Sequence, residues 1–119
     1  MSAELAGKKC VPCEGGTPPL SKQEAEKYLQ DFAGWSLIDN RIEKDYRFKS
    51  YLDGLNFAYA LGRIAEEENH HPDIMVKWRR VKISLSTHAI KGLSENDFIM
   101  AAKAELEYGK YPAPAPKAP

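Results

Sequence analysis

The sequence has no net charge, no long apolar run and only two cysteines. Its 17 basic residues balance its 17 acidic residues, so no overall field attracts nucleic acid or an anionic membrane. The N-terminal stretch lacks the apolar run of a secretory signal or a membrane span. Because the sequence has few cysteines and no recognisable export signal, we expect a reducing, cytoplasmic environment. These absences together predict a protein that binds neither nucleic acid nor membrane.

Common catalytic signatures are also absent. The sequence holds no phosphate-binding glycine loop, no nucleophile elbow and no dinucleotide fingerprint. Cys10 and Cys13 have the CxxC spacing of zinc or redox ligands, but neither a second cysteine pair nor a strand-helix-strand redox unit follows them. The histidines, His70, His71 and His88, lack the one-turn spacing that is usual for metal-binding pairs. A zinc protein built on these cysteines and histidines therefore stays a weaker alternative.

The length of the chain suits one domain with a single hydrophobic core. Residues 1–19 are rich in glycine and proline and show no periodicity, so we expect an irregular N-terminal arm. Residues 110–119 form a Pro/Ala-rich tail that cannot bury enough apolar surface to fold. The single domain is therefore expected over residues 20–109.

Helix and hairpin signals open the domain. Ser21 and Glu24 form a capping-box pattern, and apolar residues then recur at helical spacing. A hairpin is predicted over residues 35–48, because Asp39 and Asn40 suit a two-residue turn that needs positive φ.

Two further helices are predicted from caps and apolar stripes. The second runs from about Ser50 towards His70. The third begins at Ser94, where the letters "SEND" are typical of a helix cap. Its inward-facing residues are expected to be Phe98, Ile99, Ala102 and Leu106.

A second hairpin lies between these two helices. Its last strand alternates, and the apolar residues expected to face the core are Val81, Ile83 and Leu85. The polar residues of that strand, with His88 near its end, face the other way. Arg79 and Arg80 suit positive φ poorly, so we expect a turn longer than two residues.

This order of elements predicts an α+β fold of the αββαββα type. Two hairpins with helices between them indicate a four-stranded antiparallel sheet with the helices packed on one face. The uncovered face, which would carry His88, is a surface where a partner subunit often docks. A non-catalytic dimerisation module that binds another protein on this face is therefore an alternative function.

The histidines allow both a structural and a functional interpretation. His70 and His71 fall in the last turn of the second helix, where a charged imidazole interacts favourably with the helix dipole. Pro72 pushes His71 towards extended geometry, and such a bend can bring neighbouring rings to one rim. His88 is as readily a surface residue of its strand. If the second helix crosses the sheet, however, its end approaches the end of the last strand, and all three imidazoles line one site.

Asp97 follows Ser94 at the position that completes a cap and opposes the helix dipole. The same carboxylate can orient a histidine, because it has several lone pairs. Imidazole exists as acid and as base near neutral pH, so a group of histidines is suited to moving protons. This chemistry favours an elimination or tautomerisation of a small polar molecule over hydrolysis.

Two stretches, "ENHHPDIMVKW" and "VKISLSTHAIKGLSEND", closely resemble the pterin-4a-carbinolamine dehydratase family. The family joins a His-His-Pro motif to an aromatic residue, a later histidine and an aspartate. The matching residues here are His70, His71, Pro72, Trp78, His88 and Asp97. The resemblance runs from about Leu20 to Tyr108, and "CVPCEGGTPPL" looks like the arm of bacterial-type members.

The resemblance implies an αββαββα fold that assembles as dimers or tetramers. Members of the family dehydrate 4a-hydroxytetrahydropterin to the quinonoid dihydropterin, which supports tetrahydropterin recycling. Neither a metal nor an organic cofactor is implied, because the pterin itself is the substrate. Ile74 and Met75 stand where animal members carry aromatic residues, so the stacking on the pterin is expected to differ.

The resemblance also assigns roles by position. His70 and His88 would act as general acid and base, while His71 would bind the ring or share the proton transfer. Asp97 would orient an imidazole. The residues implied to contact the substrate are Pro72, Asp73, Trp78, Ser86 and Thr87.

Overall fold

The computed structural model describes residues 2–12 and 18–114 of the chain. Its elements are α1 (Ser2–Ala6), α2 (Lys22–Leu29), β1 (Ser36–Ile38), β2 (Arg41–Arg47), α3 (Tyr51–Glu68), β3 (Asp73–Lys77), β4 (Arg80–Leu85), the 3₁₀ helix η1 (His88–Ile90) and α4 (Glu95–Tyr108). From α2 onwards this is the predicted order of helices and hairpins, with η1 added before α4. The α+β fold is therefore confirmed.

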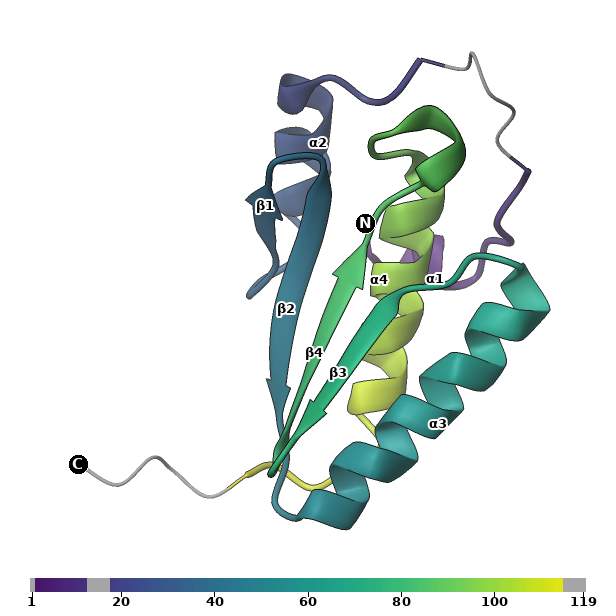
Figure 1. The fold of residues 1–119 in the computed structure, drawn as a ribbon. Helices are drawn as coiled ribbons and strands as arrows, with labels where there is room; N and C mark the ends of the chain where they lie inside the picture. Colours follow the sequence, from purple (N-terminus) through teal and green to yellow (C-terminus); the bar gives the residue numbers. More distant parts are fainter. Residues whose placement is uncertain (1, 13–17, 115–119) are drawn as a thin grey trace.

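The four strands form one antiparallel sheet in the order β1-β2-β4-β3. Its helix-facing side is fully buried along the two central strands, where the buried residues are Ile42, Tyr46, Val81, Ile83 and Leu85. The other side carries polar residues such as Glu43, Lys82 and Ser84. The helices pack on the buried side, as Figure 1 shows for α3 and α4.

Both hairpin turns contain two residues. In the first, Ile38 pairs with Arg41 and Asp39 takes a φ of 54°. In the second, Lys77 pairs with Arg80, so the turn is formed by Trp78 and Arg79. The prediction of a longer second turn is therefore wrong. Arg79 adopts a φ of 56°, and its guanidinium lies 4.1 Å from the centre of the Trp78 ring, a favourable cation–π contact.

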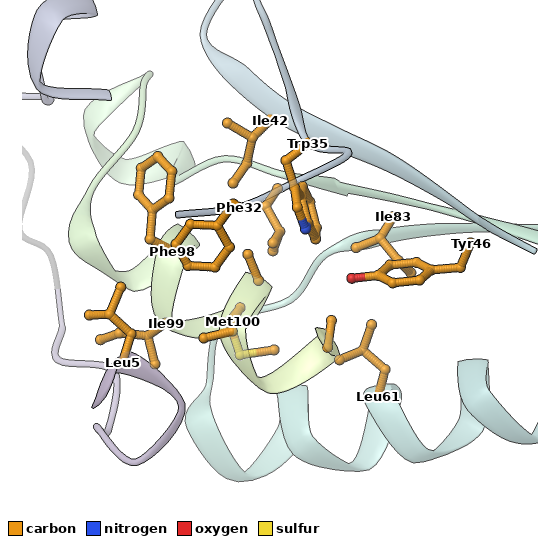
Figure 2. Close-up of a cluster of buried hydrophobic side chains, with 14 of the residues drawn as sticks. Leu5, Phe32, Trp35, Ile42, Tyr46, Leu61, Ile83, Phe98, Ile99 and Met100 are labelled. Carbon is orange, nitrogen blue, oxygen red and sulfur yellow. The ribbon is translucent and has the colours of Figure 1, made fainter. Parts of the chain in front are cut away.

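One hydrophobic core joins the sheet, α3 and α4 (Figure 2). The prediction that Leu106 faces this core is wrong, since the side chain is 65% exposed. Glu105 takes the inward position instead, and its carboxylate accepts hydrogen bonds from Lys44 (2.8 Å), Trp35 (3.3 Å) and Tyr46. A helix places Leu106 about 100° around the axis from Glu105, which turns the leucine to solvent.

The N-terminal arm is not wholly irregular, contrary to expectation. Its first described residues form α1, and Leu5 is buried in the core beside Ile99 of α4 (Figure 2). Lys103 of α4 also donates to the Ala6 carbonyl, at 2.9 Å. The apolar anchor explains the short helix, because a five-residue segment would not be helical on its own.

The predicted helix caps are present. Ser21 and Glu24 form a complete capping box at α2, and the Ser50 hydroxyl accepts from the backbone N–H of Asp53 at α3. Ser94 and Asp97 form the equivalent box at α4. The cap at α4 has a consequence for function, because it fixes Asp97 in the first turn of a buried helix.

Candidate active site

A solvent-accessible cleft of about 570 Å³ lies where the end of α3, the start of β3, the segment after β4 and the start of α4 come together. Its walls are formed by residues 10–12, 68–73, 86–89 and Asn96. The three histidines all line it. Segments far apart in the sequence therefore bring their titratable side chains to one hollow.

His70 reaches this cleft because α3 ends just before it. The helix stops at Glu68, and Asn69 caps it in the left-handed conformation with a φ of 51°. His70 and His71 thus follow the helix, and the prediction that they lie in its last turn is wrong. The bend lets the His70 ring turn back towards α4, where its Nε2 lies 2.7 Å from Oδ1 of Asp97.

Asp97 is fully buried and is the centre of a hydrogen-bond network. Its second oxygen, Oδ2, accepts from the Thr87 hydroxyl at 2.8 Å and from the Ser94 backbone N–H at 3.0 Å. The Thr87 hydroxyl also lies 2.8 Å from the Ser94 hydroxyl. Each carboxylate oxygen therefore has a partner, so the orientation of the group is fixed from two sides.

This network determines which nitrogen of His70 is available for chemistry. A carboxylate can only accept hydrogen bonds, so Nε2 of His70 must carry the hydrogen that it shares with Asp97. In the neutral imidazole, Nδ1 is then the free base. Only 11% of the His70 side chain is exposed, which limits the positions from which a proton can reach the ring.

His71 is held less firmly. Its Nε2 contacts the carboxylate of Glu66 on the last turns of α3, and both side chains are more than half exposed. Exposed pairs of this kind contribute little to stability. His71 therefore lies on the cleft wall with more freedom than His70.

His88 occupies a different element from the one predicted. Strand β4 ends at Leu85, and Thr87 then pairs with Gly92 in an isolated bridge. His88 opens the short helix η1 between these two positions and is exposed to solvent. It was expected on the polar face of the strand, yet this tight loop still directs it to the cleft that His70 and His71 line.

The other predicted substrate contacts divide into two groups. Pro72, Asp73, Ser86 and Thr87 line the cleft. Trp78 does not, because it lies at the tip of the β3–β4 hairpin, and Asp73 at the other end of β3 faces the cleft. Five residues of strand separate the two ends by roughly 16 Å. The structure of one chain therefore gives no support to a contact between Trp78 and the substrate.

The sequence analysis missed one wall of the cleft. Cys10, Val11 and Pro12 of the arm line it together with Asn96 of α4. The backbone N–H of Cys10 donates to Oε1 of Glu68 at 2.7 Å, which ties the arm to the end of α3. The arm binds through its backbone groups, and such contacts leave no periodic pattern of side chains in the sequence. The letters "CVPC" therefore did not indicate that the arm lines the cleft.

The same segment was considered as a zinc site. Cys13 lies outside the described residues. Within residues 2–12 and 18–114, no group of three or more His, Cys, Asp or Glu side chains is arranged to hold a metal ion. Nor does any helix in this part of the chain combine the length and apolar character needed to cross a membrane.

Burial gives Cys10 an unusual thiol. Partial burial, together with the nearby carboxylate of Glu68, raises the pKa of Cys10 to about 12. Because only the thiolate reacts, we expect iodoacetamide at pH 8 to alkylate Cys10 about 10³-fold more slowly than an ordinary cysteine. The rate is measured in a Cys13→Ser variant, which leaves one thiol, and the same variant unfolded in urea is the control. Equal rates in the folded and unfolded samples would contradict the expectation.

Comparison with known proteins places this geometry in a family. The model of the family described as pterin 4 alpha carbinolamine dehydratase matches residues 18–106. A protein of Azoarcus sp. (strain BH72) that bears the name of this dehydratase is 51% identical over 107 residues, covering 88% of this chain and 92% of its own length. One of Nitrosomonas eutropha with the same name is 49% identical over 104 residues, covering 87% of this chain and 92% of its own length.

A solved structure agrees with the sequence relatives. It is described as a transcriptional coactivator/pterin dehydratase from Brucella melitensis, and it superposes with a TM-score of 0.74 at 29% sequence identity. The match covers 76% of this chain and 99% of the Brucella chain. The three histidines that line the cleft thus lie within the residues that the family model matches. The chain belongs to the pterin-4a-carbinolamine dehydratase family.

Proposed function

We propose that this chain is a hydro-lyase that dehydrates 4a-hydroxytetrahydropterin to quinonoid dihydropterin and water, and that it serves tetrahydropterin recycling in the cytoplasm. The family membership supports the substrate class. The observation that carries the proposed mechanism is the pairing of His70 with buried Asp97 beside a cleft that His71 and His88 also line.

The reaction needs two proton transfers and no redox step. The bond between C4a and the hydroxyl oxygen breaks, and that oxygen takes up a proton and leaves as water. The N5–H bond breaks as well, and its electron pair forms the double bond between N5 and C4a. One proton is thus gained by the substrate and one is lost, so a pair of groups that act as acid and base suffices.

His70 is suited to one of these transfers. With Nε2 engaged by Asp97, a neutral His70 can accept the N5 proton on Nδ1, and a protonated His70 can give a proton to the leaving hydroxyl. Asp97 keeps the tautomer and stabilises the imidazolium that forms. His88, exposed on η1, is proposed as the complementary group, and His71 as a ring contact or a partner in proton transfer.

Homo-oligomer formation is also proposed, as the family resemblance implies. Large apolar side chains are exposed on the outer side of α3, where Tyr51, Leu52 and Tyr59 are each between 47% and 72% exposed. A partner subunit would remove this surface from water. Sedimentation velocity tests whether the protein forms an oligomer. A single monomeric species would contradict the proposal.

The assay for the proposed function follows the substrate directly. The carbinolamine is generated in situ, and its ultraviolet decay is recorded by stopped flow with and without the protein. We expect the decay rate to rise in proportion to protein concentration. A rate that the protein does not change would instead favour the non-catalytic dimerisation module.

A further inference from the structure

Residues 10–12, called here the arm wall, line the cleft although they precede the part of the chain that the family model matches. That match begins at residue 18. The arm wall nevertheless shares the cleft with His70, His71 and His88. A segment outside the family core therefore helps to shape the candidate active site.

Asn96 holds the arm wall through both backbone groups of one residue. Its side-chain oxygen accepts from the N–H of Val11 at 3.0 Å, and its amide donates to the Val11 carbonyl at 2.6 Å. Asn96 is itself buried in the first turn of α4. The two hydrogen bonds pair with the N–H and the carbonyl of Val11 in the same way as a neighbouring β-strand would. This contact therefore fixes the orientation of Val11 as well as its position.

Further contacts hold the arm on either side of Val11. The Cys10 N–H binds Glu68, whose carboxylate also lies 3.8 Å from the Lys103 ammonium. Lys103 in turn donates to the Ala6 carbonyl at 2.9 Å, beside the buried Leu5. The arm is thus anchored to α3, to α4 and to the core, so residues 10–12 are held in a defined position at the cleft.

These anchors use the backbone of Val11 and leave its side chain largely exposed. With its backbone satisfied by Asn96, Val11 is 65% exposed and presents an apolar surface at the cleft, with Pro12 next to it. The three histidines and Asp73 supply polar groups elsewhere along the cleft. A bicyclic pterin has hydrogen-bonding edges and apolar faces, so it needs both kinds of surface.

We infer that the arm wall is a part of the substrate site that determines affinity: Val11 packs against the pterin, and Asn96 is the positioning residue that holds it there. This inference rests on the proposed function. The contact is with the bicyclic ring and not with the bond that breaks, so it is the same before and during the reaction. Such a contact raises affinity without changing the chemical step.

A Val11→Ala variant tests the contact. We expect KM for the carbinolamine to rise about fivefold to tenfold while kcat stays within about twofold, because the removed methyl groups contribute equally to both states. The Kd of a stable oxidised pterin, measured by fluorescence titration, should rise by the same factor. Leu106→Ala is the matched control, since Leu106 is also 65% exposed but does not line the cleft.

An Asn96→Ala variant tests the positioning role. Loss of the two hydrogen bonds to Val11 should free the arm wall, so KM should rise as in Val11→Ala. In a Cys13→Ser background, alkylation of Cys10 should also become faster by at least tenfold. A substitution that merely weakened α4 would lower thermal stability without separating KM from kcat, and so would not reproduce this combination.

The results separate the inference from the function on which it rests. If the unmodified protein does not accelerate carbinolamine decay, the proposed function fails. If it does, and Val11→Ala has the KM and the pterin Kd of the unmodified protein, the inference about the arm wall is overturned. A rise in both constants in Val11→Ala, with none in Leu106→Ala, supports it.

Discussion

A His70→Ala substitution is expected to lower kcat for carbinolamine dehydration by about 10²–10⁴-fold, the usual contribution of a general acid or base. His70 is the histidine whose ring is fixed, by a 2.7 Å contact with a fully buried carboxylate. Its removal takes away the group that is best oriented for proton transfer. Stopped-flow decay of the substrate measures the effect, and circular dichroism verifies the fold.

A second variant separates proton transfer from structure at this position. His70→Gln can still donate a hydrogen bond to Asp97 from its side-chain amide, but it cannot titrate. We therefore expect it to be as inactive as His70→Ala while being closer to the unmodified protein in thermal stability. His71→Ala is measured alongside. Full turnover in both the His70→Ala and the His71→Ala protein would exclude the proposed mechanism and favour the dimerisation module.

An Asp97→Asn substitution should also cost about 10²-fold or more in kcat, by reversing the roles of the two His70 nitrogens. If the NH₂ group of the new side-chain amide faces His70, it donates to Nε2, and the ring hydrogen must move to Nδ1. The nitrogen that faces the reaction would then be a donor in the neutral ring, and no longer a base. If the NH₂ group faces Ser94 instead, the partly buried backbone N–H of Ser94 loses its acceptor, which costs about 1–3 kcal/mol.

Ser94→Ala is the matched control for Asp97→Asn. It removes the hydroxyl that accepts from the Asn96 N–H and contacts Thr87. It keeps both hydrogen bonds that Asp97 Oδ2 accepts, from the Ser94 N–H and from the Thr87 hydroxyl. Loss of a cap hydroxyl costs about 1 kcal/mol. We expect lower thermal stability with kcat nearly unchanged. An Asp97→Asn protein with full turnover, alongside an inactive His70→Ala protein, would show that the orientation of the ring by Asp97 is not required.

The sequence predicted the elements of this fold well where the signals were local. Ser21 with Glu24, and Ser94 with Asp97, formed the capping boxes that their spacing indicates. The alternation around Ile83 identified the buried face of the sheet. Such patterns depend on backbone geometry within a few residues, so the sequence holds the information that they need.

Predictions failed where a distant partner decided the outcome. Leu106 continued an apolar stripe, but Glu105 became the inward residue because Lys44, Trp35 and Tyr46 supply hydrogen bonds to it. No local rule reveals partners that lie about 60 or 70 residues away in the chain. The hydrogen bonds of this partly buried carboxylate compensate for its partial desolvation.

The candidate site shows the same division. The three histidines and Asp97 were identified as a group from the sequence, and the structure brings the three imidazoles to one cleft with Asp97 behind His70. The placement of His88 on η1 depended on a bridge between Thr87 and Gly92, which no motif indicated. The arm wall was missed because Asn96 binds backbone groups, which every residue possesses.

Because Asp97 has two roles, the local stability of one helix end affects the catalytic turnover. The residue both closes the first turn of α4 and holds the His70 ring. Helix ends fray more readily than cores unfold, through local openings that leave the rest of a domain intact. Each opening of this turn would release the imidazole. Heat inactivation would then precede melting, and the working temperature of the protein would be set by a single helical turn.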